Sequence, residues 1–468
     1  MRHARALGLA LLALFSLASP AQILIGQTAG FTGIVAAGVN ETTDGAKLYI
    51  DAVNAKGGIN GQKIELISMD DKFDPKLAAE NAQKLIDQNV AALFLNRGTP
   101  HTEAIMPLLE KHGVPLIGPS TGAMVLHQPV KKYLFNVRAT YQREAEKSIQ
   151  HLATIGITRI GILQTDDSFG ADSVQGALRG LEKAQLKPLF LEKLDRAKPD
   201  IERLTARVMQ EQPQAIIFIA SGATVVAGVK AMRTAGSVAQ VVTLSNNASG
   251  GFIKQLGEHA RGVIVTQVFP QSVSYGLVKE AQDLARAKGV NEVTPAMLEG
   301  FAAAKVLVEG LRRAGPKPTR ERIQAALESL SKFDIGGLEV NFSPQDHSGL
   351  DFADLSIITA DGRFRRCSPG TGADSARGAS GRARCRGRRR RRMHGVGTML
   401  LAPHVQLVTS LDDDKQGQGR KQDEADDDFP HDVFLGDAIK KKGPHARACP
   451  APASGDRGAA EMPDQSLA

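Results

Sequence analysis

The sequence predicts an α/β protein whose parallel sheets are divided between two lobes. Short apolar, β-branched segments alternate with longer amphipathic segments, and this alternation is typical of parallel sheets covered by helices. Continuous apolar runs such as 216–219 indicate strands that are buried on both faces. The body of the chain, residues 22–365, is too long for one ordinary hydrophobic core and suits two.

The expected elements follow one another in strict order up to residue 276. Strands are predicted at 23–27, 63–68, 91–95, 114–118, 159–163, 188–191, 215–220, 241–244 and 263–267. Helices are predicted at 43–56, 75–88, 102–112, 142–154, 171–184, 200–212 and 224–234, from their apolar spacing and helix-forming residues. Beyond residue 276 we expect three successive helices, 277–288, 295–314 and 319–330, and then strands at 333–340 and 352–359. This change of pattern suggests that the two lobes are interleaved along the chain.

The N-terminus has the layout of a secretory signal peptide. Basic residues at the start precede the short apolar run 7–18, and Ser19-Pro20-Ala21 supplies small residues for cleavage. We therefore expect a signal peptide over 1–21, a mature protein starting at Gln22 and a periplasmic location. The apolar run is shorter than the roughly 20 residues that a membrane span requires.

The C-terminal tail, residues 366–468, differs from the body in composition. Like charges occur in blocks at 388–392, 412–414, 426–428 and 440–442, which is typical of disordered segments. All three cysteines, Cys367, Cys385 and Cys449, also lie there, so the body has neither a disulfide nor a thiolate metal site. A frame-shifted extension explains the abrupt change best, and a basic tail that touches nucleic acid or lipid remains the alternative. We expect a shortened chain that ends at Arg365 to keep its stability and affinity.

Composition and motifs argue against several classes of protein. Aromatic residues make up 4% of the chain and Trp is absent, which disfavours a protein that stacks on carbohydrate. The glycine-rich dinucleotide motif, the P-loop and the HExxH zinc motif do not occur. The histidines of the body are scattered. We therefore expect no enzyme activity, no catalytic residues, no metal, no cofactor and no nucleic-acid partner.

The loops that follow the predicted strands share one chemistry. They are rich in Gly, Ser, Thr and Asn, and they lie at 28–33, 96–100, 119–122, 165–170, 221–224 and 245–247. In parallel α/β sheets ligands bind beyond the carboxyl ends of the strands. Free N–H groups at helix starts favour anions such as carboxylates. These residue types are also ordinary helix caps, yet their recurrence on one sheet edge favours a cleft for a small polar molecule.

These residues carry a resemblance to a known family. The segments concerned are 26–33, 45–64, 70–71, 98–100, 114–119, 135–139, 166–170, 260–267, 332–334 and 342–344. Over about residues 22–365 the chain resembles type I periplasmic solute-binding proteins, and within them the leucine/isoleucine/valine-binding-protein-like family of ABC importers. The resemblance implies two Rossmann-like lobes joined by a hinge of three crossings. It places lobe one at 22–137 plus 251–330 and lobe two at 138–250 plus 331–365.

The resemblance also implies where the ligand binds. The ligand carboxylate is expected between the Gly98-Thr99 and Ser120-Thr121 loops, with Phe169, Ser221, Ser245 and Asn246 facing it from lobe two and Tyr141 lining the cleft. Amino-acid binders of the family have an acidic residue near Ser245-Asn246, which this chain lacks, so a carboxylate or amide without the amine is a rival to an amino acid. The implied partner is an inner-membrane ABC permease. The alternative is a ligand sensor of the same fold that regulates a partner.

Overall fold

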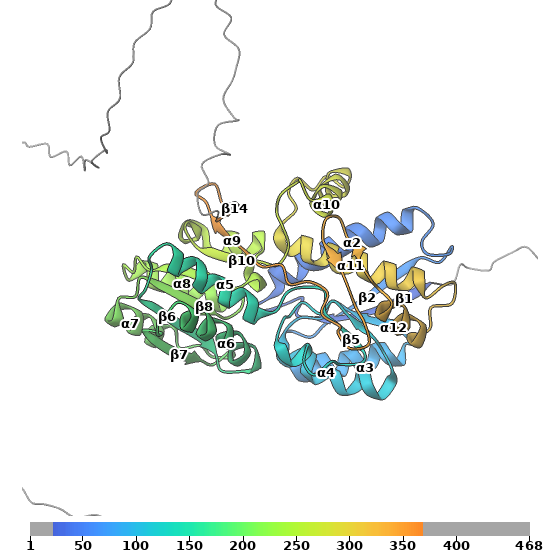
Figure 1. The fold of residues 1–468 in the computed structure, drawn as a ribbon, viewed down its shortest axis with the longest axis horizontal. Helices are drawn as coiled ribbons and strands as arrows, with labels where there is room; N and C mark the ends of the chain where they lie inside the picture. Colours follow the sequence, from blue (N-terminus) through green and yellow to red (C-terminus); the bar gives the residue numbers. More distant parts are fainter. Residues whose placement is uncertain (1–21, 368–468) are drawn as a thin grey trace, which may run out of the picture. The chain divides into compact units, whose positions relative to one another are not determined.

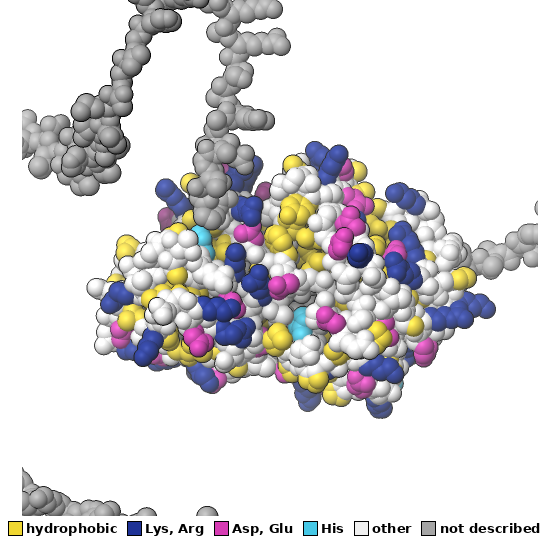
Figure 2. All heavy atoms as spheres, viewed as in Figure 1, with side chains coloured by type: hydrophobic (Ala, Val, Ile, Leu, Met, Phe, Trp, Pro, Cys, Tyr) yellow, Lys and Arg dark blue, Asp and Glu magenta, His cyan; other side chains and the backbone are white. Residues whose placement is uncertain are grey.

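The computed structural model describes residues 22–367 (Figure 1). The predicted signal peptide and the tail beyond Cys367 therefore lie outside the described residues. Within 22–367, none of the helices combines the length and the apolar character that a membrane crossing requires. On the face shown in Figure 2, Lys and Arg side chains are interspersed with Asp and Glu.

Lobe one is built on a parallel sheet of five strands in the order β2-β1-β3-β4-β5. Its strands are β1 Ile23–Ala29, β2 Ile64–Asp70, β3 Ala92–Phe94, β4 Leu116–Ile117 and β5 Leu134–Phe135. The helices between them are α2 Ala36–Ala55, α3 Pro75–Asp87 and α4 Thr99–His112. Each crossover places a helix against the sheet, as the alternating pattern of the sequence predicts.

Lobe two is built on a sheet of seven strands in the order β14-β13-β10-β9-β8-β6-β7. Its parallel strands are β6 Ile160–Thr165, β7 Phe190–Leu194, β8 Ala215–Ile219, β9 Gln240–Thr243 and β10 Ile264–Gln267. Strands β13 Asp354–Ile358 and β14 Phe364–Arg366 extend the sheet in antiparallel pairing. Its helices are α5 Tyr141–Thr154, α6 Ser168–Lys183, α7 Ile201–Glu211, α8 Ala223–Thr234 and α9 Gly250–Leu256.

After β10 the chain returns to lobe one. Helices α10 Gly276–Ala287, α11 Pro295–Arg313 and α12 Arg320–Glu328, with the short hairpin of β11 Phe333–Asp334 and β12 Glu339–Val340, join the core of lobe one. The chain thus crosses between lobes at 136–140, 268–275 and 343–353. This is the α/β architecture of two interleaved lobes with mainly parallel sheets that the sequence predicts.

Two predicted lobe boundaries differ from the observed sheets. Residues 251–267 are predicted in lobe one, but β10 pairs with β9 and α9 packs in the core of lobe two. Residues 331–342 are predicted in lobe two, but Ile335 and Val340 are buried in the core of lobe one. The reason is that the apolar run 263–265 finds its partner strand in lobe two, so the crossing falls after it.

The predicted helices of the body all occur, and two of them begin three residues earlier than predicted. Helix α4 starts at Thr99, directly after Gly98, whose φ of 99° few other residues adopt. Helix α6 starts at Ser168, where the side chain of Asp167 accepts a hydrogen bond from the backbone N–H of Gly170. The earlier starts place Thr99 and Phe169 in the first turns of their helices.

Candidate functional site

The loops at the carboxyl ends of the two sheets meet where the lobes face each other. Hydrogen bonds join the lobes at several points of this interface. The backbone N–H of Ala223 donates to the carbonyl of Ile34 at 3.0 Å, and the hydroxyl of Ser168 donates to Glu103 at 2.5 Å. The backbone N–H of Gly251 donates to Glu41 at 2.7 Å. The lobes are therefore closed against each other.

Arg97 is joined to three other residues of this interface. It lies in the loop between β3 and α4, and only 5% of its surface is exposed. Its Nη1 donates to Ser120 Oγ at 2.9 Å, and its Nη2 donates to the carbonyl of Asn246 at 2.5 Å. The side-chain amide of Asn246 donates in turn to Ser221 Oγ at 2.9 Å. A continuous polar chain thus runs from lobe one into lobe two through three of the predicted site residues.

The hydroxyls of Thr99 and Thr121 form a second polar pair, 2.8 Å apart. Both residues are buried. The loops that carry them are held together because the backbone N–H of Ser120 donates to the carbonyl of Asn96 at 2.8 Å. The structure therefore brings the two loops expected to hold a carboxylate side by side in lobe one, together with the half-buried Gly98.

Tyr141 and Phe169 supply aromatic surface from lobe two. Their ring centroids lie 4.8 Å apart at an interplanar angle of 71°, an edge-to-face arrangement. Both side chains are buried. The guanidinium of Arg138 stacks over the ring of Tyr141 at 4.5 Å, and that of Arg196 lies 5.8 Å from the ring of Phe169. These rings form an apolar patch flanked by positive charge.

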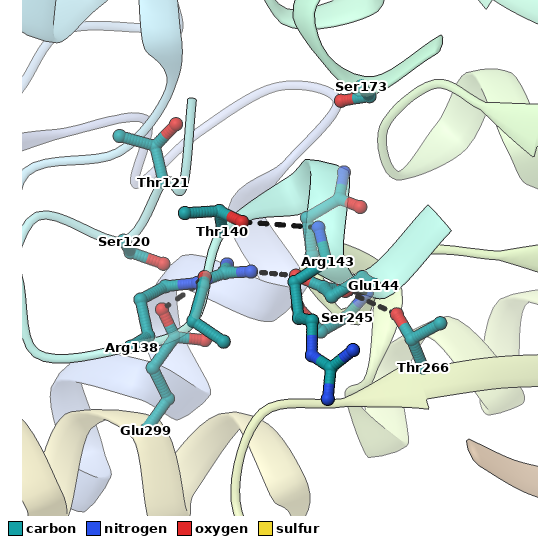
Figure 3. Close-up of polar contacts among 12 residues, drawn as sticks. Ser120, Thr121, Arg138, Thr140, Arg143, Glu144, Ser173, Ser245, Thr266 and Glu299 are labelled. Atoms are coloured by element: carbon teal, nitrogen blue, oxygen red, sulfur yellow. Dashed lines mark hydrogen bonds and ion pairs between the residues drawn. The ribbon is translucent and has the colours of Figure 1, made fainter. Parts of the chain in front are cut away.

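Ser245 is engaged by a buried carboxylate of its own lobe. Its backbone N–H donates to Glu144 at 2.9 Å and its hydroxyl donates to the same carboxylate at 3.1 Å. Thr266 and the guanidinium of Arg138 also donate to Glu144 (Figure 3). Glu299, on α11 of lobe one, lies 3.9 Å from the other side of the Arg138 guanidinium. The predicted site residue Ser245 therefore belongs to an ion-pair network.

This network lies at the first crossing between the lobes. Arg138 belongs to the crossing segment, and Glu144 lies in the first two turns of α5. Both side chains are almost fully buried. Although burial alone lowers the pKa of an arginine, the nearby charge of Glu144 raises the pKa of Arg138. Burial raises the pKa of Glu144, and the donors from Arg138, Thr266 and Ser245 oppose that rise, so these contacts favour the carboxylate beside the guanidinium.

Three residues of the interface, Arg97, Arg138 and Glu144, are not among those predicted from the sequence. Arg97 adjoins the Gly98-Thr99 loop, and a basic residue between a buried strand and a predicted anion-binding loop is a usable signal. Glu144 lies one helical turn before the buried Ser148, so its helical position alone places it on a buried face. Within residues 22–367, no cluster of three or more His, Cys, Asp or Glu side chains could hold a metal ion.

One catalytic pattern does occur in the chain. Residues 118–122 have the G-x-S-x-G spacing of serine hydrolases, in which the serine lies on a turn from a strand directly into a helix. Here the residues after Ser120 are irregular up to the short 3-10 helix Met124–Leu126. The hydroxyl of Ser120 accepts from Arg97, a cation that cannot serve as a general base. The context of a nucleophile is therefore lacking at this serine.

Comparisons with known proteins agree with this fold. Residues 22–360 match the family model described as periplasmic binding protein. A solved substrate-binding periplasmic protein from Ralstonia solanacearum is 31% identical, with a TM-score of 0.68 over 74% of this chain and 100% of that one. A possible leucine/isoleucine/valine-binding protein from Rhodopirellula baltica SH 1 is 25% identical, with a TM-score of 0.71 over 76% and 98% of the two chains. The Leu/Ile/Val-binding protein BraC3 of Rhizobium johnstonii is 25% identical over 66% of this chain and 84% of its own.

Proposed function

We propose that this chain, which belongs to the periplasmic binding protein family and resembles its Leu/Ile/Val-binding members, captures one small solute by closing its two lobes and delivers it to an ABC permease. The family is extracytoplasmic and works with ABC transporters. For this chain the proposed solute is an amino acid or a related small carboxylate or amide.

The polar chain across the lobe interface is the observation that supports this function best. Arg97 and Ser120 of lobe one connect with Asn246 and Ser221 of lobe two through hydrogen bonds of 2.5–2.9 Å. A solute that contacts both ends of such a chain binds the closed form better than the open form, and this difference in affinity is what drives closure.

The remaining candidate residues have proposed roles in the same cleft. Gly98 and Thr99 provide donors at the start of α4, where free N–H groups favour an anionic oxygen, and Thr121 adds a hydroxyl from the loop after β4. Tyr141 and Phe169 provide the apolar wall against which the body of the solute packs.

The two ends of the chain have proposed roles outside the binding body. The segment 1–21 is proposed to direct export and to be removed near Ala21. Residues 22–365 are proposed to be sufficient for binding, and the tail 366–468 to be dispensable for it.

A ligand screen on the full mature chain tests the function. Amino acids, aliphatic acids and aromatic acids are added singly, the melting temperature is recorded, and small-angle scattering is measured with each compound that raises it. At least one compound is expected to raise the melting temperature and to reduce the radius of gyration. A stabilising compound that leaves the radius unchanged contradicts binding by lobe closure, and a screen without any stabilising compound contradicts solute capture.

A further inference from the structure

We infer that Arg97 anchors a carboxylate and makes the cleft selective for organic anions that carry no ammonium group. The inference rests on the proposed function, because it names the class of solute that the same cleft takes. Three observations support it: Arg97 is buried, its hydrogen-bond partners are neutral, and the carboxylates around the interface face other groups of the protein.

Arg97 is a buried cation whose partners are neutral oxygens. Its side chain is 95% buried, yet it donates only to the hydroxyl of Ser120 and to the carbonyl of Asn246. No carboxylate within residues 22–367 lies within 4.0 Å of its guanidinium nitrogens. Arginines are seldom buried without an opposite charge, because taking a charge out of water is costly. A ligand carboxylate supplies that charge, and the planar fork of an arginine suits it.

The acidic groups around the interface face donors or cations of the protein: Glu299 lies 3.9 Å from Arg138 without a hydrogen bond to it, and the others accept hydrogen bonds. Glu144 accepts from Arg138 and from three groups of lobe two. Asp167 pairs with Arg196 at 2.5 Å, and Glu103 accepts from Ser168. Glu41 accepts from the backbone N–H groups of Gly250 and Gly251 and from the hydroxyl of Thr294.

An α-ammonium would bring a second positive charge close to Arg97. Arg138 faces Glu144 and Glu299, and Arg196 pairs with Asp167, so of the arginines near the aromatic rings of Tyr141 and Phe169 only Arg97 has no carboxylate within 4.0 Å among residues 22–367. Like charges repel each other, most strongly where water is excluded. A carboxylate without an ammonium avoids this repulsion.

The role of an anion anchor differs from that of a latch, by which we mean a residue that only links the two lobes by hydrogen bonds. A latch would hold Ser120 and Asn246 together whatever the charge of the solute. An anion anchor instead contributes to binding only when the solute carries a carboxylate. The affinities for a carboxylate and for its neutral amide therefore separate the two roles.

The experiment uses two sets of matched compounds and the full mature chain. The aliphatic set is 4-methylpentanoate, 4-methylpentanamide and leucine. The aromatic set is 3-phenylpropanoate, 3-phenylpropanamide and phenylalanine. Isothermal titration calorimetry at pH 7.5 is expected to show that the carboxylate binds at least ten-fold more tightly than the amide and the amino acid of its set.

Two variants and a matched control follow. Arg97→Gln is expected to weaken carboxylate binding by about 10- to 100-fold and amide binding by less than three-fold, since a hydrogen bond to a charged group is worth more than one to a neutral group. Arg97→Lys keeps the charge but not the planar fork of donors, so its carboxylate affinity should lie between those of the wild-type chain and Arg97→Gln. Arg320→Gln is the control: Arg320 is partly buried and donates to the backbone carbonyls of Ile86, Val90 and His112, away from the cleft, so affinity should not change.

Each other outcome is decisive. Tighter binding of leucine or phenylalanine than of the deaminated acid overturns the inference and leaves the proposed function intact. An equal loss of amide and carboxylate binding in Arg97→Gln makes Arg97 a latch and also overturns it. If circular dichroism shows that Arg97→Gln does not fold, Arg97→Lys decides. Unchanged selectivity and affinity in Arg97→Lys would contradict the role of the planar guanidinium in binding the carboxylate. If none of the six compounds binds to the wild-type chain, the inference fails, whereas the proposed function fails only if the wider screen also finds no stabilising compound.

Discussion

Replacing Glu144 by glutamine tests the ion-pair network at the first crossing between the lobes. The substitution keeps the shape of the side chain and removes its charge. The carboxylate accepts hydrogen bonds from Arg138, from both polar groups of Ser245 and from Thr266. A glutamine offers one acceptor oxygen and turns an N–H₂ donor toward groups that themselves donate.

The expected cost follows from this geometry. The side chain of Glu144 is fully buried and that of Arg138 is 2% exposed, so water cannot replace the lost partner. Breaking a buried pair by neutralising one member costs about 3–5 kcal/mol, because the other charge is left unpaired. Glu299, at 3.9 Å, offsets part of this cost, which places the expected loss in the free energy of unfolding near the lower end, about 3 kcal/mol.

Equilibrium unfolding in urea measures this loss, and Glu146→Gln serves as the matched control. Glu146 lies on the same helix and pairs with Lys183 at 2.6 Å, but that lysine is 61% exposed. The Glu146 side chain is only 10% exposed, but because its lysine partner lies in solvent the pair is expected to contribute about 1 kcal/mol. Equal losses in the two variants, or a loss below about 1 kcal/mol in Glu144→Gln, would refute the assignment of a charged, buried network to the crossing.

Three further predictions concern closure, the cleft and pH. A β-carbon at Gly222 would lie 1.7 Å from the carbonyl oxygen of Ile34 in the other lobe. Gly222→Ala should therefore weaken binding of the best compound of the screen more than ten-fold, as measured by calorimetry. Gly236→Ala is the control, because Gly236 has positive φ but no atom within 4 Å of an added β-carbon, and equal affinities of the two variants would contradict closure at the Gly222 contact. Ser120→Ala should weaken carboxylate binding about ten-fold and change the free energy of unfolding by about 1 kcal/mol. A lower melting temperature with unchanged affinity would show that Ser120 stabilises the fold and does not contribute to binding. Burial lowers the pKa of His101 to about 4, so the unfolded chain takes up a proton before the folded chain does as the pH falls. The contribution of this imidazole to the free energy of unfolding should therefore fall by on the order of 3 kcal/mol between about pH 6.5 and about pH 4. The buried His127, whose pKa is also lowered to about 4, adds a similar slope, so His101→Phe should reduce the slope of the pH–stability curve without abolishing it. An unaltered curve would count against a buried neutral imidazole at His101.

The regular elements of the lobes were predictable because their signals are local. The continuous apolar run of β8 and the amphipathic pattern of α3 are each contained in one segment. The second lobe boundary was not predictable in this way, because β10 is assigned to lobe two by its pairing with β9 and β13. The sequence of residues 263–267 does not indicate with which strands they will pair.

The positions of the candidate residues were predictable from their loops, whereas their contacts were not. Ser120, Ser221 and Asn246 follow predicted strands, so the carboxyl edges of the sheets place them at the lobe interface. The roles of individual polar atoms depend on partners far away in the chain. Ser245 and Glu144 are 101 residues apart, and Arg97 and Asn246 are 149 residues apart. Only the folded arrangement shows that one serine is committed to the ion-pair network while its neighbour Asn246 meets Arg97.

The two buried arginines of the lobe interface differ in how their charge is balanced. Arg138, in the crossing, has Glu144 and Glu299 on either side, so its charge is balanced within the protein. Arg97 has only neutral oxygens from the two lobes. A balanced pair favours the folded crossing whether or not a solute is bound. Under the proposed function, an anion that binds beside Arg97 would balance its charge and would stabilise the closed arrangement in particular. On that proposal, the coupling between solute charge and lobe closure depends on keeping carboxylates near the crossing and away from Arg97.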